Sequence, residues 1–246
     1  TQGPYWVDEG LERSDITIDP SDSSVQVGVP LELRLSLVRT DGDCAPLAGV
    51  QIDVWHCNAY GLYSDETANN TLGKKFLRGY LFTDSNGLVV FQTIYPGWYS
   101  GRTIHIHFRV RAYTGATTTY NWTSQLAFPE SVNNAAMAIA PYNSRGARNT
   151  TNATDGIYNA SMLMTLTSDG SGGYIAEHAV GLAGVPTSSA TTSTTLAGGT
   201  TTSTTTTTLP TAGCATDGTF AAATCQITAL RTSILFLMLY LIFARE

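Results

Sequence analysis

Residues 1–184 consist of short apolar runs separated by turn-forming residues, without a sustained helical period of 3.6 residues. Apolar and polar residues alternate strictly in residues 31–37, 50–54 and 104–110. Because successive side chains of a strand point to opposite faces of a sheet, each stretch predicts a half-buried β-strand. Residues 83–87 combine Asp, Asn and Gly and precede an apolar run, so we expect a hairpin there. Together these signals predict an all-β sandwich.

The composition changes after residue 184. Between residues 186 and 212, 18 of 27 positions are Ser or Thr and none is charged. Such a segment buries too little apolar area to offset the entropy lost on ordering, so we expect a disordered, O-glycosylated stalk. The sequence therefore divides into a folded domain at 1–184, a Ser/Thr-rich stalk at 185–212 and a C-terminal tail at 213–246.

The tail ends in eleven apolar residues, 234–244. A helix needs about 20 residues to cross a bilayer, so this run is too short to span one. Small residues, a polar spacer and an apolar end make up the layout of a GPI-attachment signal, which would anchor the protein at the cell surface. The charged Arg245 and Glu246 fit this layout poorly. A secreted protein without an anchor and a fortuitous apolar end are the two alternatives.

Several features predict secretion. The chain begins with Thr1 rather than Met, which is expected after removal of a leader. Five Asn-x-Ser/Thr sequons occur, at Asn69, Asn121, Asn149, Asn152 and Asn159. The last three fall within eleven residues and predict a glycosylated surface loop. Short separation along the chain favours disulfides between Cys44 and Cys57 and between Cys214 and Cys225, with four free thiols as the alternative.

The charge content excludes two classes of protein. Thirteen Lys and Arg against nineteen Asp and Glu give a net charge of −6, and no basic run exceeds Lys74-Lys75. Binding to a nucleic-acid backbone needs a basic face, so we expect no nucleic acid as a partner. Charged residues make up only 13% of the chain, which argues against a charge-rich coiled coil.

Two of the four histidines, His105 and His107, are one residue apart in the alternating stretch 104–110. On a strand both imidazoles point to one face while the apolar residues between them face the core. The pair can therefore bind one metal ion, and ordinary polar-face histidines are the alternative. A turn-rich loop immediately upstream brings Tyr99 and Arg102 to the same end. There the arginine and a metal would favour the phenolate form of the tyrosine.

Six strings within residues 1–184 are highly specific as a set. They are Gly3-Pro4-Tyr5-Trp6-Val7, Arg13-Ser14-Asp15-Ile16, Cys44-Ala45-Pro46-Leu47, the stretch from Val54 to Ser64, Phe76-Leu77-Arg78-Gly79, and the stretch from Tyr95 to His107. With these strings the chain resembles the intradiol ring-cleavage dioxygenases. The resemblance is strongest to the short secreted fungal-type members, which are related to catechol 1,2-dioxygenase and protocatechuate 3,4-dioxygenase. It implies that residues 1–184 form the β-sandwich of the family's catalytic core.

Members of that family hold a non-haem ferric ion, Fe(III), with two tyrosinates, two histidines and a hydroxide. Carried over by motif, the first tyrosine ends Trp-His-x-x-x-x-Gly-x-Tyr and is Tyr63, and the second closes Pro-Gly-x-Tyr and is Tyr99. The His-Ile-His string supplies His105 and His107. Phenolate oxygens are hard donors that suit Fe(III), whereas a zinc site would more often recruit Cys or a carboxylate beside His.

The resemblance also implies roles for neighbouring residues. Arg102 takes the place of the arginine that stabilises negative charge on the substrate ring, and Gln125 resembles a second polar pocket residue. Tyr99 is expected to leave the iron when substrate binds and to act as a base. Tyr60 and Tyr95 are not at ligand positions of the family pattern and are expected to pack or to form the pocket wall, and His56 is expected to make a structural hydrogen bond.

The implied reaction is cleavage of a catechol by O2 between its two hydroxylated carbons, giving cis,cis-muconate-type products without nicotinamide, flavin or added reductant. The expected partners are a small catechol or phenolic substrate and O2. No helical dimerisation segment precedes Gly3, so we expect a monomer with an open mouth. One alternative is a non-catalytic β-sandwich for adhesion or ligand binding on a mucin-like stalk. Another is a zinc or copper enzyme built on His105 and His107.

Overall fold

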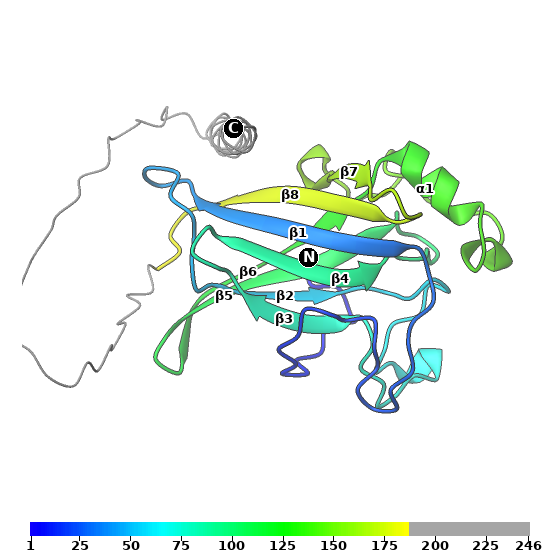
Figure 1. Cartoon of the computed structure of the whole chain (residues 1–246), viewed down its shortest axis with the longest axis horizontal. Coiled ribbons are helices and arrows are strands. Elements are labelled where there is room, and N and C mark those ends of the chain that lie inside the picture. The colour runs from blue at the N-terminus through cyan, green and yellow to red at the C-terminus, as the bar shows by residue number, and fades with distance from the viewer. Residues whose placement is uncertain (187–246) are drawn as a thin grey trace, which may run out of the picture.

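The computed structural model describes residues 1–186, and the predicted stalk and tail beyond them lie outside the described residues. Two four-stranded sheets pack face to face and form the predicted β-sandwich (Figure 1). Within residues 1–186, no helix has the length and apolar character needed to cross a membrane.

The first sheet has the strand order β4-β1-β8-β7. Its strands are β1 (Pro30–Arg39), β4 (Leu88–Ile94), β7 (Thr165–Ser168) and β8 (Tyr174–Leu182). β1 runs antiparallel to β4 and parallel to β8, between which it lies in Figure 1. The parallel pair joins the first strand of the described chain to the last.

The second sheet has the strand order β3-β2-β5-β6, and all of its pairs are antiparallel. Its strands are β2 (Gln51–Trp55), β3 (Arg78–Phe82), β5 (His105–Thr114) and β6 (Thr117–Ala127). The register places His107 opposite Trp55 on one side and opposite Gln125 on the other. Residues that are opposite each other in a sheet share a face, so these three side chains are neighbours.

Short helical segments occupy the connections. They are η1 (Thr67–Asn69), α1 (Glu130–Met137), η2 (Tyr142–Arg145) and η3 (Ala160–Met162). Pro129 precedes α1, and Glu130 places a negative charge in its first turn, which suits the positive end of the helix dipole.

The core lies between the two sheets and confirms the three strands predicted from alternation. Every second residue of β1 is a fully buried leucine: Leu31, Leu33, Leu35 and Leu37. They belong to one apolar cluster with residues of β2 and β5, including Ile52, Val54, Ile106, Phe108 and Val110. The alternation thus identifies the faces correctly.

The hairpin predicted at residues 83–87 is wrong. The turn itself forms, because the Asp84 side chain accepts hydrogen bonds from the amides of Asn86 and Leu88, both at 2.8 Å. However, β3 before the turn pairs with β2, and β4 after it pairs with β1 in the other sheet. The turn is therefore a corner between the sheets. Turn residues specify a local reversal of the chain and do not specify whether the flanking strands pair.

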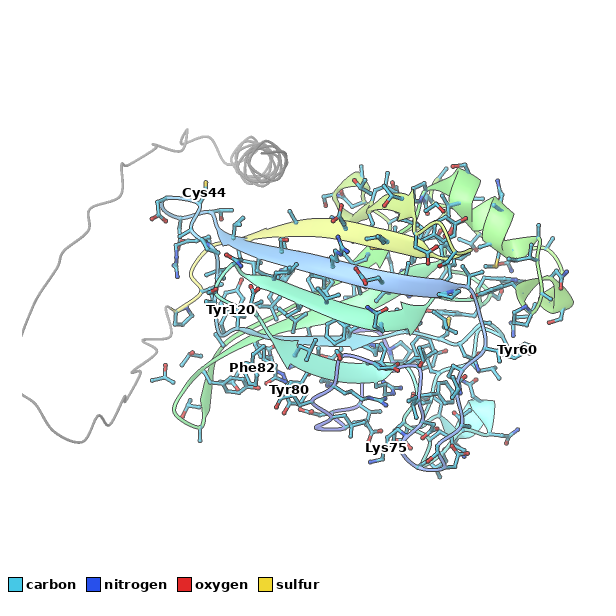
Figure 2. All side chains as sticks on the ribbon, in the orientation of Figure 1. Cys44, Tyr60, Lys75, Tyr80, Phe82 and Tyr120 are labelled. Atoms are coloured by element: carbon cyan, nitrogen blue, oxygen red, sulfur yellow. The ribbon has the colours of Figure 1, made fainter. Side chains whose placement is uncertain are left out.

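The predicted pairing of Cys44 with Cys57 is also wrong. Cys57 is a free thiol that is 1% exposed, so it does not pair with Cys44. Figure 2 shows Cys44 at one end of the sandwich and Tyr60, three residues after Cys57, at the opposite end. Proximity in sequence failed because β2 runs along the sandwich between the two cysteines.

Candidate metal centre

The site lies on the face of the second sheet that points away from the sandwich core. His105 and His107 leave this face of β5, whereas Ile106 and Phe108 belong to the core, as predicted. Both histidines are nevertheless buried, at 3% and 1% exposure. Loops and the N-terminal segment, rather than a second sheet, cover them.

Two loops deliver the tyrosines. Tyr63 follows β2 and Tyr99 follows β4. The loops are joined by a hydrogen bond from the Gly97 amide to the Asn58 carbonyl at 3.1 Å. A Cβ at Gly97 would lie 2.4 Å from the Ala59 carbonyl oxygen, so this close approach requires glycine. The Pro-Gly-x-Tyr motif therefore places Tyr99 beside Tyr63, with ring centroids 5.8 Å apart.

The predicted donor atoms converge. The Oη of Tyr99 lies 3.1 Å from Nε2 of His105, and that nitrogen lies 3.1 Å from Nε2 of His107. Ligands about 2.1 Å from a metal and about a right angle apart are separated by about 3 Å. The spacing of these atoms thus fits donors arranged around one ion.

The tautomer of His105 supports this arrangement. Its Nδ1 lies 2.6 Å from the carbonyl oxygen of Thr103, which can only accept a hydrogen bond. The proton therefore resides on Nδ1, and Nε2 directs a lone pair into the site. A backbone carbonyl that fixes the tautomer of a metal-binding histidine is a common feature of metal sites.

Tyr63 gives a second test of the fit. Its ring is 1% exposed, and its Oη makes no hydrogen bond of normal geometry within residues 1–186. A buried hydroxyl without a partner costs free energy, which makes such groups rare. A metal ion between Tyr63, Tyr99 and the two histidines would satisfy it.

The same part of the chain offers no other complete ligand set. No three or more His, Cys, Asp or Glu side chains gather closely enough to hold a metal within residues 1–186. Any ion bound by His105 and His107 must therefore complete its ligand set with phenolic oxygens or solvent. The donor set contains two nitrogens and two phenolic oxygens. These are harder donors, in the hard–soft sense, than the cysteine-containing sets that zinc commonly selects.

Without a metal, all four donors are neutral near pH 7. Burial lowers the pKa of His105 to about 3, and the positive charge of Arg102 adds to this shift. Burial and the neighbouring His105 lower the pKa of His107 well below its usual value. Burial raises the pKa of Tyr99 to about 12 and that of Tyr63 well above 10. Arg102 favours both phenolates, but burial outweighs it, so ionisation requires the additional charge of a metal.

The structure brings the two predicted pocket residues together. Nη2 of Arg102 donates to Oε1 of Gln125 at 2.5 Å. Nε of Arg102 donates to Oδ2 of Asp155 at 2.9 Å. The amide of Thr103 donates to the same oxygen at 2.7 Å. Amide donors and Arg102 hold the pKa of Asp155 below its usual value, although burial acts in the opposite direction.

The N-terminal segment forms the cover of the site. Tyr5 stacks on Tyr63 with ring centroids 4.3 Å apart, and Trp6 packs against Trp55 at 4.6 Å. Gly3 adopts a φ of +65° directly over His107, where a Cβ would lie 3.2 Å from Cε1 of the imidazole. The Gly-Pro-Tyr-Trp string is therefore a structural part of the site.

The sequence motifs assign no role to two residues that hold parts of the site together, Arg78 and Asp155. Arg78 is 2% exposed and donates from Nη1 to the Tyr5 carbonyl and from Nη2 to the Ser64 carbonyl, both at 2.7 Å. It thereby ties the N-terminal cover to the Tyr63 loop. Asp155 is the second. Arg78 falls within one of the quoted strings, but its burial and its contacts with distant segments are visible only in three dimensions.

The remaining neighbours lie outside the donor cluster. Tyr95 is fully buried in the core and donates to Asn133 at 2.7 Å, and Tyr60 lies at the surface (Figure 2). His56 contacts Cys57 O and Thr93 Oγ1, as expected of a structural histidine. Burial raises the pKa of the Cys57 thiol to about 12, so this thiol stays protonated and is a poor metal ligand.

Comparison with known proteins places the chain in a family. A family model described as Dioxygenase matches residues 1–140, more than half of the 246-residue sequence. An intradiol ring-cleavage dioxygenase from Tetranychus urticae has the same fold, with a TM-score of 0.65, 27% identity, and coverage of 76% of this chain and 94% of that chain. The chain belongs to the intradiol ring-cleavage dioxygenase family.

Other intradiol dioxygenases agree with this assignment. A catechol 1,2-dioxygenase from Candida albicans is 33% identical over 131 residues, which cover 44% of this chain and 40% of the relative. A chlorocatechol 1,2-dioxygenase from Pseudomonas putida is 31% identical over 133 residues, covering 45% of this chain and 46% of that protein. The chain spans about half the length, or less, of these curated relatives.

Proposed function

We propose that this protein is an intradiol dioxygenase that uses O2 to open the ring of a catechol-type ortho-diphenol between its two hydroxylated carbons. Family membership and the names of the relatives support the reaction class. The observation that carries the proposal is that Nε2 of His105 lies 3.1 Å from Tyr99 Oη and 3.1 Å from Nε2 of His107.

The donor chemistry favours Fe(III) as the metal. Tyr63, Tyr99, His105 and His107 would hold it, and the two phenols would bind as hard anionic oxygens. When bound, a ferric ion would supply a Lewis acid that draws electron density from an ortho-diphenol. A non-catalytic binding domain, the alternative function, would not need two histidines and two tyrosines gathered at one place, with the buried Tyr63 hydroxyl left without a hydrogen-bond partner.

The two tyrosines suit different tasks. Tyr63 is 1% exposed and lies beneath the ring of Tyr5, whereas Tyr99 is only half-buried. Tyr99 would therefore be the tyrosine that is accessible to an entering substrate. Its phenolate oxygen would accept a proton from the diphenol, because partial burial raises the pKa of Tyr99 to about 12.

Arg102 provides positive charge beside the donors. Its charge lowers the pKa of both histidines, so its field reaches the site. Held between Gln125 and Asp155, the guanidinium would stabilise negative charge that develops on the diphenol ring. The aromatic cover formed by Tyr5 and Trp6 would exclude water from the opposite side.

We further propose that the protein acts outside the cell, as a monomer, either free or held by a C-terminal anchor. Three sequon asparagines are exposed, namely Asn121, Asn149 and Asn159. Asn69 is half-buried, and Asn152 is only 8% exposed. Exposed sequons support secretion, because glycans require surface positions.

The proposed function is tested with the purified full-length protein. We expect about one iron per chain, a visible absorption band from tyrosinate-to-iron charge transfer, and O2 uptake on addition of catechol. Tyr63→Phe should remove the band and the uptake. Tyr60→Phe, in the same loop but at the surface, is the matched control and should leave both unchanged. A folded wild-type protein that binds zinc instead of iron, or takes up no O2 with any catechol, would refute the proposal.

A further inference from the structure

Asp155 lies 53 positions after Arg102 in the chain, yet its carboxylate contacts the Arg102 side chain. One carboxylate oxygen, Oδ2, accepts from Nε of Arg102 at 2.9 Å and from the amide of Thr103 at 2.7 Å. A single atom thus holds both the side chain of Arg102 and the backbone that leads into β5.

The carboxylate is itself held rigidly. Its other oxygen, Oδ1, accepts from the amides of Ile157 at 2.7 Å and Tyr158 at 3.2 Å. The Asp155 side chain has no exposed surface, whereas that of Arg102 keeps 15%. An ion pair with a buried, fully hydrogen-bonded partner has a defined geometry, unlike a pair between two mobile surface side chains.

The contacts leave one side of the guanidinium free. Nε is used by Asp155 and Nη2 by Gln125, and Nη1 has no protein partner within residues 1–186. The plane of a guanidinium is fixed once two of its nitrogens are held. The N–H groups of Nη1 therefore point in a direction that the two contacts determine.

We propose that Asp155 is a positioning residue of the active site, whose carboxylate orients the guanidinium of Arg102 toward the bound diphenol. This inference rests on the proposed function. The Asp155 carboxylate makes no hydrogen bond to the four donor side chains, so we expect it to act through Arg102. Without it, the arginine would keep its charge but would lose the contact that sets its plane.

Asn152 anchors the same loop but does not contact Arg102, so it separates loop anchoring from the role proposed for Asp155. Asn152, on the same loop, accepts from Oγ1 of Thr103 at 2.6 Å and donates to the Phe128 carbonyl at 2.9 Å. It fastens the loop without touching Arg102. Loss of Asn152 therefore reports loop anchoring alone, and loss of Asp155 reports anchoring together with the orientation of Arg102.

The test is steady-state kinetics of the iron-loaded enzyme with catechol. Asp155→Asn places an amide where two donors, Arg102 Nε and the Thr103 amide, need an acceptor. We expect kcat to fall by about 10- to 100-fold, less than the roughly 100- to 1,000-fold loss typical when a charge-stabilising donor is itself removed, because Arg102 is still present. The iron content and the visible band should be unchanged, since no ligand is altered.

The decisive readout is a double-mutant cycle with Arg102→Ala. If Asp155 acts through Arg102, adding Asp155→Asn to Arg102→Ala should lower kcat no further. Two matched controls accompany it. Asp169→Asn removes a similar turn-stabilising carboxylate between β7 and β8, whose Oδ1 accepts from Ser171 at 2.7 Å, and should leave kcat unchanged. Asn152→Ala should lower kcat less than Asp155→Asn does.

Each remaining outcome decides the question. Full kcat in Asp155→Asn, or additive losses in the double variant, would overturn the positioning role while the proposed function stands. A wild-type enzyme without iron or O2 uptake would overturn both. If Asp155→Asn does not fold, Asp155→Ser keeps an oxygen for the turn amides but carries no charge, and the same kinetic result is expected of it.

Discussion

The two faces of β5 differ in what covers them and in what they do. The inner face contributes Ile106, Phe108 and Val110 to the core, all at 1% exposure or less. The outer face carries His105 and His107, which are equally buried but under loops and the N-terminal segment. One strand thus anchors the fold on one side and presents polar donors on the other.

This difference separates stability from chemistry. A sheet-on-sheet core is densely packed and holds its strands in place. Donor atoms mounted on the opposite face of such a strand are held precisely without contributing much apolar contact themselves. Substitution of an outer-face residue of β5 should therefore mainly lower metal binding and activity, whereas substitution of an inner-face residue should mainly lower stability.

The largest effect is expected on the outer face. His107→Ala removes one of the proposed ligands, and we expect iron, colour and O2 uptake to be lost, with activity falling by more than about 100-fold. Metal analysis and an oxygen electrode give the measurement. His178→Ala, on β8 in the first sheet, is the control and should retain activity. Full iron occupancy in His107→Ala would contradict the ligand assignment.

Phe108, the next residue on the inner face, should matter for stability rather than for metal binding. Phe108→Ala leaves a cavity in the core and should lower the free energy of unfolding by about 3–5 kcal/mol. The folded fraction should still bind iron. Denaturant unfolding measures the change, and Phe82→Ala, at a position that is 45% exposed on β3, should cost far less. Equal losses in the two variants would show that the core is not where the stability lies.

A smaller effect concerns a buried histidine outside the donor cluster. Burial lowers the pKa of His56 to about 4, against about 6.5 in the unfolded chain. Between these values the unfolded state binds more protons, so stability rises with pH from 4 to 6.5 and is lost as pH falls. From pH 6.5 to 4.5 the loss from this group is about 2–3 kcal/mol.

The measurement is the denaturant midpoint of wild type and His56→Gln at pH 4.5 and 7.5. The variant should show a shallower decline toward acid, because it lacks the group that takes up the proton on unfolding. The pH dependence that remains comes from other groups, including His105. Identical declines in the two proteins would show that His56 is not buried in its neutral form.

The last prediction concerns glycan occupancy, which should differ between the buried sequon near the donor cluster and the exposed sequons. Asn152 is only 8% exposed and its Nδ2 faces the Phe128 carbonyl, so the folded loop leaves no room for a glycan on this nitrogen. In a eukaryotic secreting host we expect glycans at the exposed Asn121 and Asn159 and none at Asn152. Glycopeptide mass spectrometry of the active fraction measures occupancy. An active protein with a glycan at Asn152 would contradict the loop geometry.

Sequence patterns revealed the faces of strands better than their partners. Alternation in β1, β2 and β5 identified which residues enter the core, because the face of a side chain depends only on its neighbours in the chain. The partner of β4 could not be found in this way, since pairing across the sandwich depends on distant segments. The free thiol of Cys57 was missed for the same reason.

The candidate site was predictable where local motifs carry it. The His-x-His pair and the Pro-Gly-x-Tyr turn pointed to His105, His107 and Tyr99, and the family resemblance supplied Tyr63. Gln125 reaches the site because the β5–β6 register places it opposite His107. Asp155 comes from a loop beyond α1, and no local signal links it to Arg102.

The central claim is that two phenolic oxygens and two imidazole nitrogens hold one ferric ion. Crystals of the iron-loaded protein measured at the iron absorption edge test it most directly. A single anomalous peak should lie about 2.0–2.2 Å from Oη of Tyr63, Oη of Tyr99, and Nε2 of His105 and His107. A well-ordered, iron-loaded crystal whose peak lies elsewhere, or whose Tyr63 and Tyr99 oxygens point away from the histidines, would contradict the claim.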